Sequence, residues 1–219
     1  MRRAMTKSMT QSLTVPFFTY SDEMNSTDLI ALRKEIKRAH NSITLLPFFI
    51  KACSLAMDTH PIINSHIDGE IDHEGYIKQF VIKKNHNFTV AIASKDGLVV
   101  PNIKNVQDKS ILHINEELLD LRKKAETGGL TREDFEDGTF SVSSVGNLGG
   151  RYFVPTIMRP QAAIIAIGQA HREAKYVEDF SHPDGYKWEP MDAVNFSISA
   201  DHRVLDGATV ASFSVKMKQ

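Results

Sequence analysis

The sequence predicts a single domain of the α/β or α+β class, because short strand-like and helix-like segments alternate along it without a long linker, internal repeat or low-complexity tract. The 219 residues are enough to bury a core without disulfides or metals. The hydrophobic fraction of 42% is ordinary for a globular protein and excludes wholesale disorder. One domain spanning residues 1–219 is therefore expected.

The charge balance and the apolar pattern exclude several classes of partner. The 26 Lys and Arg residues almost balance the 27 Asp and Glu residues, so the net charge of -1 favours neither nucleic acid nor an anionic membrane. The most apolar run, residues 45–57, is interrupted by Lys51 and Ser54 and is shorter than the ~20 residues of a membrane span. A single cysteine excludes an intrachain disulfide and a Cys-rich zinc or iron–sulfur site.

Hydrophobic periodicity and turn residues set the bounds of the predicted elements. In chain order these are an amphipathic helix at residues 1–13, a strand over 15–24, a helix from Asn25 or Ser26, a buried helix over 45–57, and a polar hairpin that turns at Asp68-Gly69 and ends near Ile82. They continue as strands over 88–93 and 98–100 around the Asp96-Gly97 turn, a helix from Ile111 to Gly128-Gly129, strands over 139–145, 162–167 and 194–200, and a helix after Ala208.

The two ends of the chain allow second interpretations. The opening MRRAMTKSMTQSL has arginines and serines but no acidic residue, as transit peptides do, although an amphipathic helix of the domain is the preferred interpretation. The last predicted helix stops within a few turns, which is expected of a chain trimmed at its C-terminal end.

Several potential binding motifs lack the residues that their chemistry needs. The nine histidines include no pair four residues apart around a glutamate, so no metal site is expected. The SVGNLGG stretch lacks the Lys-Ser/Thr that follows a phosphate loop, and it is expected to be a turn. Lys109 follows an aspartate, as a lipoylated lysine would, but it immediately precedes a predicted helix. Cys53 lies inside the apolar helix and is expected in the core.

One group of residues is a candidate active site, the segment DHRVLDG that directly follows the strand at 194–200. A histidine held at the end of a strand can face a cavity, and an imidazole can take a proton from a thiol or a hydroxyl at neutral pH. The residues alone leave two interpretations open. His202 and Asp206 are either a general base with a supporting carboxylate or an ordinary polar turn.

This segment resembles the His-x-x-x-Asp-Gly motif of the chloramphenicol acetyltransferase-like superfamily, and DHRVLDGA resembles the catalytic motif of dihydrolipoamide acyltransferases, the E2 components of 2-oxo acid dehydrogenase complexes. Other stretches that match in order are VPFFTYSDEM, LPFFIKACSLAM, GLVVPNIKNV, GTFSVSSVGNLGG and PQAAIIAIG. The resemblance covers essentially the whole chain and is strongest to the branched-chain acyltransferases. It implies an α/β, two-layer fold in which helices flank a mixed β-sheet.

The resemblance also implies an activity, the transfer of a branched-chain acyl group from S-acyl-dihydrolipoamide to coenzyme A. His202 is expected to be the general base and Ser143, or its neighbour Ser144, the hydrogen-bond donor to the oxyanion. Asp206 is expected to hold the turn through an ion pair with Arg3 or Lys7. The residues expected to contact coenzyme A are Arg33, Thr44, Ser143, Ser144, Gly168 and Ala170, with Arg122 as a further candidate.

Partners and location follow from the same resemblance. Lipoamide is expected on a separate lipoyl domain, and E1 and E3 are expected to bind through lipoyl and peripheral-subunit-binding modules that these residues do not contain. Copies of the chain are expected to form trimers and a cubic 24-subunit shell, with His202 of one chain facing Ser143 of its neighbour. The expected compartment is the mitochondrial matrix, with a bacterial cytoplasm as the alternative.

Three other functions remain open at this point: an acetyl- or succinyl-transferring core, an antibiotic O-acetyltransferase of the same fold, and a catalytically silent scaffold. Antibiotic acetyltransferases usually carry His-His where this chain has Asp201-His202. Intact His202, Ser143 and Asp206 argue against a silent scaffold. The sequence departs from the family at Phe17, where a histidine is usual, and in a short insertion around residues 181–188 that is expected to be peripheral.

Overall fold

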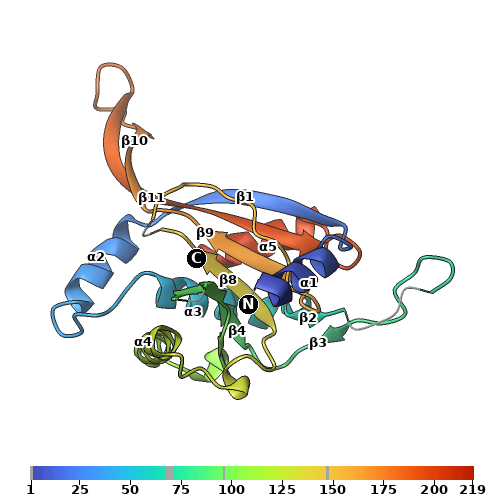
Figure 1. The fold of residues 1–219 in the computed structure, drawn as a ribbon. Coiled ribbons are helices and arrows are strands. Elements are labelled where there is room, and N and C mark those ends of the chain that lie inside the picture. Colours follow the sequence, from blue (N-terminus) through green and yellow to red (C-terminus); the bar gives the residue numbers. More distant parts are fainter. Residues whose placement is uncertain (1, 68–71, 96, 147) are drawn as a thin grey trace.

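The computed structural model describes residues 2–67, 72–95, 97–146 and 148–219. Within these residues a seven-stranded sheet has the strand order β1-β11-β9-β8-β4-β7, with β10 paired to β11 (Figure 1). Strand β8 is parallel to β4 and β9, and the other pairs are antiparallel, which confirms the predicted mixed sheet. The strands are β1 (Phe17–Asn25), β4 (Phe88–Val90), β7 (Asn102–Ile103), β8 (Phe140–Ser144), β9 (Ala163–Ile167), β10 (His171–Glu178) and β11 (Tyr186–Asp201).

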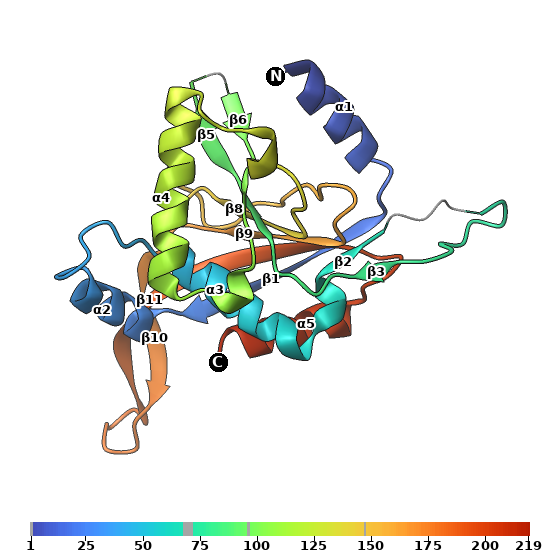
Figure 2. The same cartoon turned by 90° about the horizontal axis from the view of Figure 1, so that it is seen from below.

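Helices flank this sheet, as the fold prediction requires (Figure 2). α3 (Leu46–Thr59) packs between α4 (Ile111–Thr127) and α5 (Gly207–Met217) in a layer against one face. The opening segment forms α1 (Arg2–Ser12), whose residues line a cavity with β8 on the other face. α2 (Thr27–Ile36) follows β1 at the end of the sheet. No helix in the described ranges is both long and apolar enough to cross a membrane.

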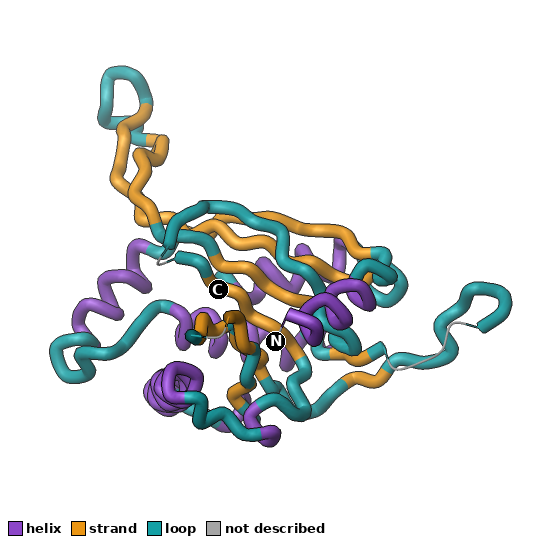
Figure 3. The backbone as a smooth tube through the Cα atoms, in the orientation of Figure 1, coloured by secondary structure: helices purple, strands orange, loops and turns teal. Residues whose placement is uncertain are grey.

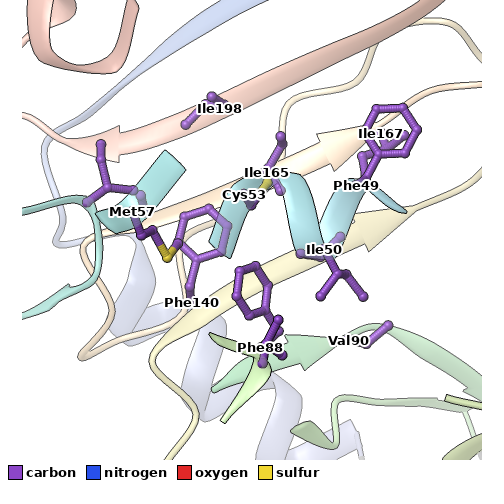
Figure 4. Packing of buried hydrophobic residues seen from close by; sticks show 14 of the residues in the cluster. Phe49, Ile50, Cys53, Met57, Phe88, Val90, Phe140, Ile165, Ile167 and Ile198 are labelled. Atoms are coloured by element: carbon purple, nitrogen blue, oxygen red, sulfur yellow. The ribbon is translucent and has the colours of Figure 1, made fainter. Parts of the chain in front are cut away.

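The core forms where α3 packs on the sheet (Figure 4). Cys53, at the centre of α3, is fully buried, and burial raises the pKa of its thiol to about 12, so it is a core residue, as predicted. Each large apolar side chain buried in this way contributes about 1.5–3 kcal/mol. The core residues labelled in Figure 4 are Phe49, Ile50, Cys53, Met57, Phe88, Val90, Phe140, Ile165, Ile167 and Ile198.

The helix ends follow local capping chemistry. The Ser110 side chain accepts a hydrogen bond from the backbone N–H of His113 at the start of α4. The same helix ends at Gly128, whose φ of 75° lies in the left-handed region that favours glycine. At α2 the N-cap is Ser26, which makes no side-chain cap bond, and the residue before it, Asn25, accepts from the backbone N–H of Thr27 at 3.1 Å. These contacts explain why both helices begin near the predicted positions and why α4 ends at the predicted glycine.

The largest difference from the predicted elements is a hairpin arm, residues 171–192, that projects from the sheet (Figures 1 and 3). β10 was not predicted because its sequence, HREAKYVE, is mostly charged and exposed and lacks a β-branched run. β11 is 16 residues long, whereas the pattern predicted a strand only over 194–200. The insertion around residues 181–188 covers the turn of this arm and the first three residues of β11, so it is peripheral, as expected, but part of it is strand and not loop.

Two hairpins lie outside the central sheet. The predicted strand over 88–93 divides at Ala91 into β4 and β5 (Ile92–Ser94), because β5 leaves the central sheet and pairs with β6 (Gly97–Val99). Asp96 of that turn lies outside the described residues. The earlier hairpin is formed by β2 (Ser65–His66) and β3 (Val81–Ile82), and its predicted turn at residues 68–69 is also outside them.

Candidate active site

The segment from Asp201 to Gly207 leaves the end of β11 and turns into α5. Asp201 is buried, and its carboxylate accepts hydrogen bonds from Arg203 Nε at 2.9 Å, Nη2 at 2.6 Å and the backbone N–H at 3.1 Å. The bonds to Asp201 raise the pKa of the Arg203 guanidinium. Because separating such a pair would leave a buried charge uncompensated, the pair fixes the shape of the turn. The ion pair between Asp201 and Arg203 was not predicted from the sequence, although the two opposite charges on either side of His202 indicate it.

His202 is held by its backbone and reaches solvent with its ring. Its backbone N–H donates to the carbonyl oxygen of Pro16 at 2.9 Å. The imidazole packs against Phe18 of β1, with ring centroids 4.6 Å apart and an interplanar angle of 51°. Phe17, which replaces the usual histidine, lies opposite Asp201 in the β1–β11 register. The exposed imidazole is therefore positioned by β1 while it remains accessible to a thiol.

The ion pair expected for Asp206 is not formed in the described part of the chain. Asp206 is exposed and caps α5, where its carboxylate accepts from the backbone N–H of Thr209 at 2.7 Å. The hydrogen bonds with Thr209, and more weakly the charge of His202, hold the pKa of Asp206 below its usual range. The expectation of a bond to Arg3 or Lys7 was wrong for a physical reason, because a carboxylate at a helix start is satisfied locally by backbone N–H groups.

Asp206→Ala is expected to lower the free energy of unfolding and the unfolding temperature, because α5 loses its N-cap. Asp206→Asn should lose much less, because the amide oxygen can accept the same bond from Thr209. Thermal unfolding of the two variants checks this. Equal losses for both variants would show that the charge, rather than the cap, supports the turn.

Ser143 and Ser144 are neighbours in β8, and their side chains point to opposite faces of the sheet. Ser143 is half-buried and lines a cavity of ≈ 500 Å³ together with Met5 and Met9 of α1. Ser144 is exposed and lines a cavity of ≈ 240 Å³ on the other face. We name these the Ser143 cavity and the Ser144 cavity. The two hydroxyls therefore serve different spaces and cannot substitute for one another.

The Ser144 cavity brings together four of the residues expected to contact coenzyme A, namely Thr44, Ser144, Gly168 and Ala170. Arg122 lines the same cavity, and burial lowers the pKa of its guanidinium. No ion pair of Arg122 with a carboxylate occurs among the residues that the structure describes. A partly desolvated guanidinium without a carboxylate favours an anionic ligand in this space.

Two of the expected coenzyme contacts carry buried polar atoms without a hydrogen-bond partner in the described ranges. These atoms are Arg33 Nε and Thr44 Oγ1. Leaving a buried polar atom unpaired costs about 1–3 kcal/mol, so such atoms mark places where a ligand can supply the missing bond. Thr44 lines the Ser144 cavity, whereas Arg33, on α2, does not.

Gly168 has a second reason to be glycine besides its place in the Ser144 cavity. A Cβ added there would lie 2.1 Å from the carbonyl oxygen of Arg151 and 3.0 Å from that of Asn195. The Gly168 N–H also donates to the Asn195 carbonyl at 2.8 Å. The backbone of Arg151 and Asn195 thus leaves no room for a side chain, so glycine is required at position 168 even without a bound coenzyme.

His202 and Ser143 lie far apart within one chain. Ser143 is opposite Ala166 of β9, and Ala166 is opposite Ser197 of β11. From Ser197 to His202 the chain advances by ~16 Å at about 3.3 Å per residue, and two strand spacings add to this separation. The two side chains therefore cannot reach one reacting atom in a single chain.

The mixed sheet covered by helices has the chloramphenicol acetyltransferase-like fold, with a histidine at the end of an inner strand and a serine that faces a cavity. A chloramphenicol acetyltransferase structure superposes with a TM-score of 0.57 and covers 97% of this chain and 92% of its own, at 12% identity. That similarity concerns the fold alone.

The chain belongs to the 2-oxoacid dehydrogenase acyltransferase (catalytic domain) family, whose model matches residues 1–219. It is 40% identical over 220 residues to the mitochondrial lipoamide acyltransferase component of the branched-chain alpha-keto acid dehydrogenase complex of Caenorhabditis elegans. That alignment covers 99% of this chain and 46% of the relative, so the chain spans less than half the relative's length.

Two solved structures share the fold closely. The cubic core of a pyruvate dehydrogenase multienzyme complex has a TM-score of 0.88 and 29% identity, and covers 99% of this chain and 86% of its own. Azotobacter vinelandii dihydrolipoamide acetyltransferase has a TM-score of 0.88 and 28% identity, with coverage of 99% and 86%. The latter was solved to investigate a serine, a histidine and an asparagine four residues after the histidine in its catalytic mechanism.

Proposed function

We propose that this chain is the catalytic core of a dihydrolipoamide acyltransferase that passes a branched-chain acyl group to coenzyme A. The observation that carries the proposal is the turn after β11, in which His202 is fixed by Pro16 and Phe18 while its ring stays exposed. The name of the Caenorhabditis elegans relative supports the branched-chain substrate. The Azotobacter protein supports the site, because Asp206 has the spacing of its asparagine, and both residue types can cap a helix.

In the proposed reaction His202 removes the proton from the coenzyme A thiol, and the thiolate attacks the acyl carbonyl carbon of S-acyl-dihydrolipoamide. The Ser143 hydroxyl donates a hydrogen bond to the oxyanion of the tetrahedral intermediate, a contribution typically worth ~10²–10³ in rate. The intermediate collapses by breaking the bond to the dihydrolipoamide sulfur. The imidazolium returns its proton to that sulfur, which leaves His202 neutral for the next turnover.

The proposed site is completed by a second copy of the chain, because His202 and Ser143 of one chain are too far apart to act on one atom. A trimer in which each His202 faces the Ser143 cavity of its neighbour meets this requirement with one repeated interface. Assembly of such trimers into a cubic 24-subunit shell is proposed by analogy with the cubic core whose structure this chain resembles.

The remaining proposals concern the ligand and its carriers. The nucleotide part of coenzyme A is proposed to occupy the Ser144 cavity, with Arg122, Thr44 and Ala170 as contacts and Arg33 as a further contact, while its pantetheine arm passes β8 so that the thiol reaches Ser143. The acyl group would arrive on a lipoyl domain, and E1 and E3 would be recruited through further modules of the whole protein. The mitochondrial matrix is the proposed compartment, which the name of the Caenorhabditis elegans relative supports.

Acyl exchange tests this function directly. The purified protein is mixed with free dihydrolipoamide and, separately, with isobutyryl-, acetyl- or succinyl-coenzyme A, and thioester formation is followed. We expect the highest kcat/KM with isobutyryl-coenzyme A. A preference for acetyl- or succinyl-coenzyme A would reassign the acyl class, and no turnover with any of the three would contradict the enzymatic proposal.

A further inference from the structure

Three side chains converge where the hairpin arm meets the sheet. Around Ala193, β1 and β10 lie along the two edges of β11, since Asn25 and His171 both pair with that residue. Glu23 is opposite Asn195 and Glu173 is opposite Met191, so their side chains emerge on the same face as that of Ala193. Because Ala193 between them is small, the longer side chains can meet above it.

The distances between these side chains are those of a metal site. One ligand atom each from Glu23, His171 and Glu173 lies within 4.8 Å of the others. His171 Nε2 is 3.3 Å from the Glu173 carboxylate. Two ligands of a tetrahedral zinc ion, at 2.0–2.1 Å from the metal, are about 3.4 Å apart, so this pair already has the required separation. Strands hold all three residues, which makes the arrangement more rigid than a loop site would be.

The second ring nitrogen of His171 is also arranged as in metal-binding histidines. Nδ1 is 3.3 Å from the carbonyl oxygen of Gln169, which can only accept, so the tautomer with the proton on Nδ1 can donate a hydrogen bond there. In that tautomer the lone pair of Nε2 faces the Glu173 carboxylate. A ligating histidine almost always donates its other N–H in this way. The His171 side chain is only 11% exposed, so water screens this arrangement poorly.

The two carboxylates of this cluster favour a cation, and Glu23 is the exposed one of the two. Among the described residues neither Glu23 nor Glu173 forms an ion pair with lysine or arginine. Two carboxylates and a neutral imidazole that converge without a lysine or arginine partner form a donor set suited to a divalent transition metal.

We propose that Glu23, His171 and Glu173 bind a divalent transition metal ion, with Zn²⁺ the best match to one nitrogen and two carboxylate oxygens and with water as the fourth ligand. The ion joins β1 to the base of the hairpin arm. Since His171 directly follows Gln169 and Ala170, which line the Ser144 cavity, the ion also fixes one wall of that cavity. Sequence spacing could not reveal the site, because Glu23 and His171 are 148 positions apart in the chain.

The test uses the whole chain after dialysis against EDTA and then against buffer. Zn²⁺ is added while bound metal is counted by mass spectrometry of dialysed protein and the unfolding temperature is recorded. Co²⁺ provides an optical probe of tetrahedral coordination. We expect one ion per chain and an unfolding temperature that rises with Zn²⁺ concentration, as linkage requires for a ligand of the folded state.

His171→Ala and Glu173→Gln should weaken binding at least about 100-fold, since loss of even an outer-shell partner costs 10–100-fold. The control is His182→Ala, on the tip of the same arm, which should leave the affinity unchanged. Glu173→Gln keeps the size of the side chain, so it reports on binding if His171→Ala unfolds. The proposal is overturned if Zn²⁺ does not bind, or if it binds the His171→Ala and Glu173→Gln variants as tightly as the wild type. In either case the contact between His171 and Glu173 is an ordinary polar contact and not part of a metal site.

Discussion

Replacing His202 by alanine is expected to lower kcat for acyl exchange by about 10²–10⁴-fold, the usual contribution of a general base. The change should fall mainly on kcat, because the imidazole acts on the proton of the thiol and lies outside the Ser144 cavity proposed for coenzyme A. Steady-state kinetics with isobutyryl-coenzyme A and dihydrolipoamide measure both parameters.

The fold should survive this substitution, because His202 is exposed and the turn is held by Asp201 and Arg203. The control is His73→Ala, a histidine with a side chain that is 91% exposed and lies far along the chain from the site. Its rate should match the wild type. If His202→Ala retained the wild-type rate while folding normally, the base would have to be sought elsewhere.

Mixing two inactive variants is expected to restore activity. His202→Ala subunits keep Ser143, and Ser143→Ala subunits keep His202, so co-refolded trimers contain some interfaces with both groups. With random mixing at equal amounts in a cyclic trimer, about one quarter of the sites should be intact. The reason is that the base and the oxyanion donor are separate roles, which need only meet in space.

A second mixture distinguishes shared from single-chain sites quantitatively. Wild type is co-refolded with the variant that carries both substitutions. If the sites are shared, about one quarter of the activity remains, because both chains at an interface must be wild type. If each site lies within one chain, about one half remains, because only that chain must be wild type. If the first mixture stays inactive while both variants assemble, His202 and Ser143 do not form a site between copies.

Elements with strong local signals were predictable from the sequence. α4 has apolar residues at helical spacing, a serine cap and a glycine stop, and the structure ends it at Gly128 as expected. β10 was missed because its signal is tertiary. Its residues pair with β11 over its full length, but its charged side chains give no alternation of apolar and polar residues that would predict a strand. A single strand over residues 88–93 was predicted in place of β4 and β5, because the residues around Ala91 carry no turn signal where the pairing partner changes.

The candidate site was predictable where its residues form a motif or match stretches of a known family. His202 followed from its motif, and the grouping of Thr44, Gly168 and Ala170 followed from the resemblance. The pairing of Asp201 with Arg203 depends on the burial of Asp201, and the sequence alone does not show which side chain is buried. The cap formed by Asp206 depends on where α5 begins. Local geometry of this kind decides whether a carboxylate meets a cation or a backbone N–H.

The pairing of β1 with β11 has a consequence for biosynthesis. The hydroxyls of Thr19 and Ser199 lie 3.1 Å apart in adjacent strands but are separated by 180 positions in the chain. At ~5–20 residues per second, a ribosome needs roughly 10–35 s to make β11 after β1 has emerged. During that interval β1 exposes unpaired backbone groups, which are a template for pairing with another nascent chain. The order of synthesis thus leaves β1 without its partner strand until β11 is made, and a chaperone that covers β1 would act in that interval.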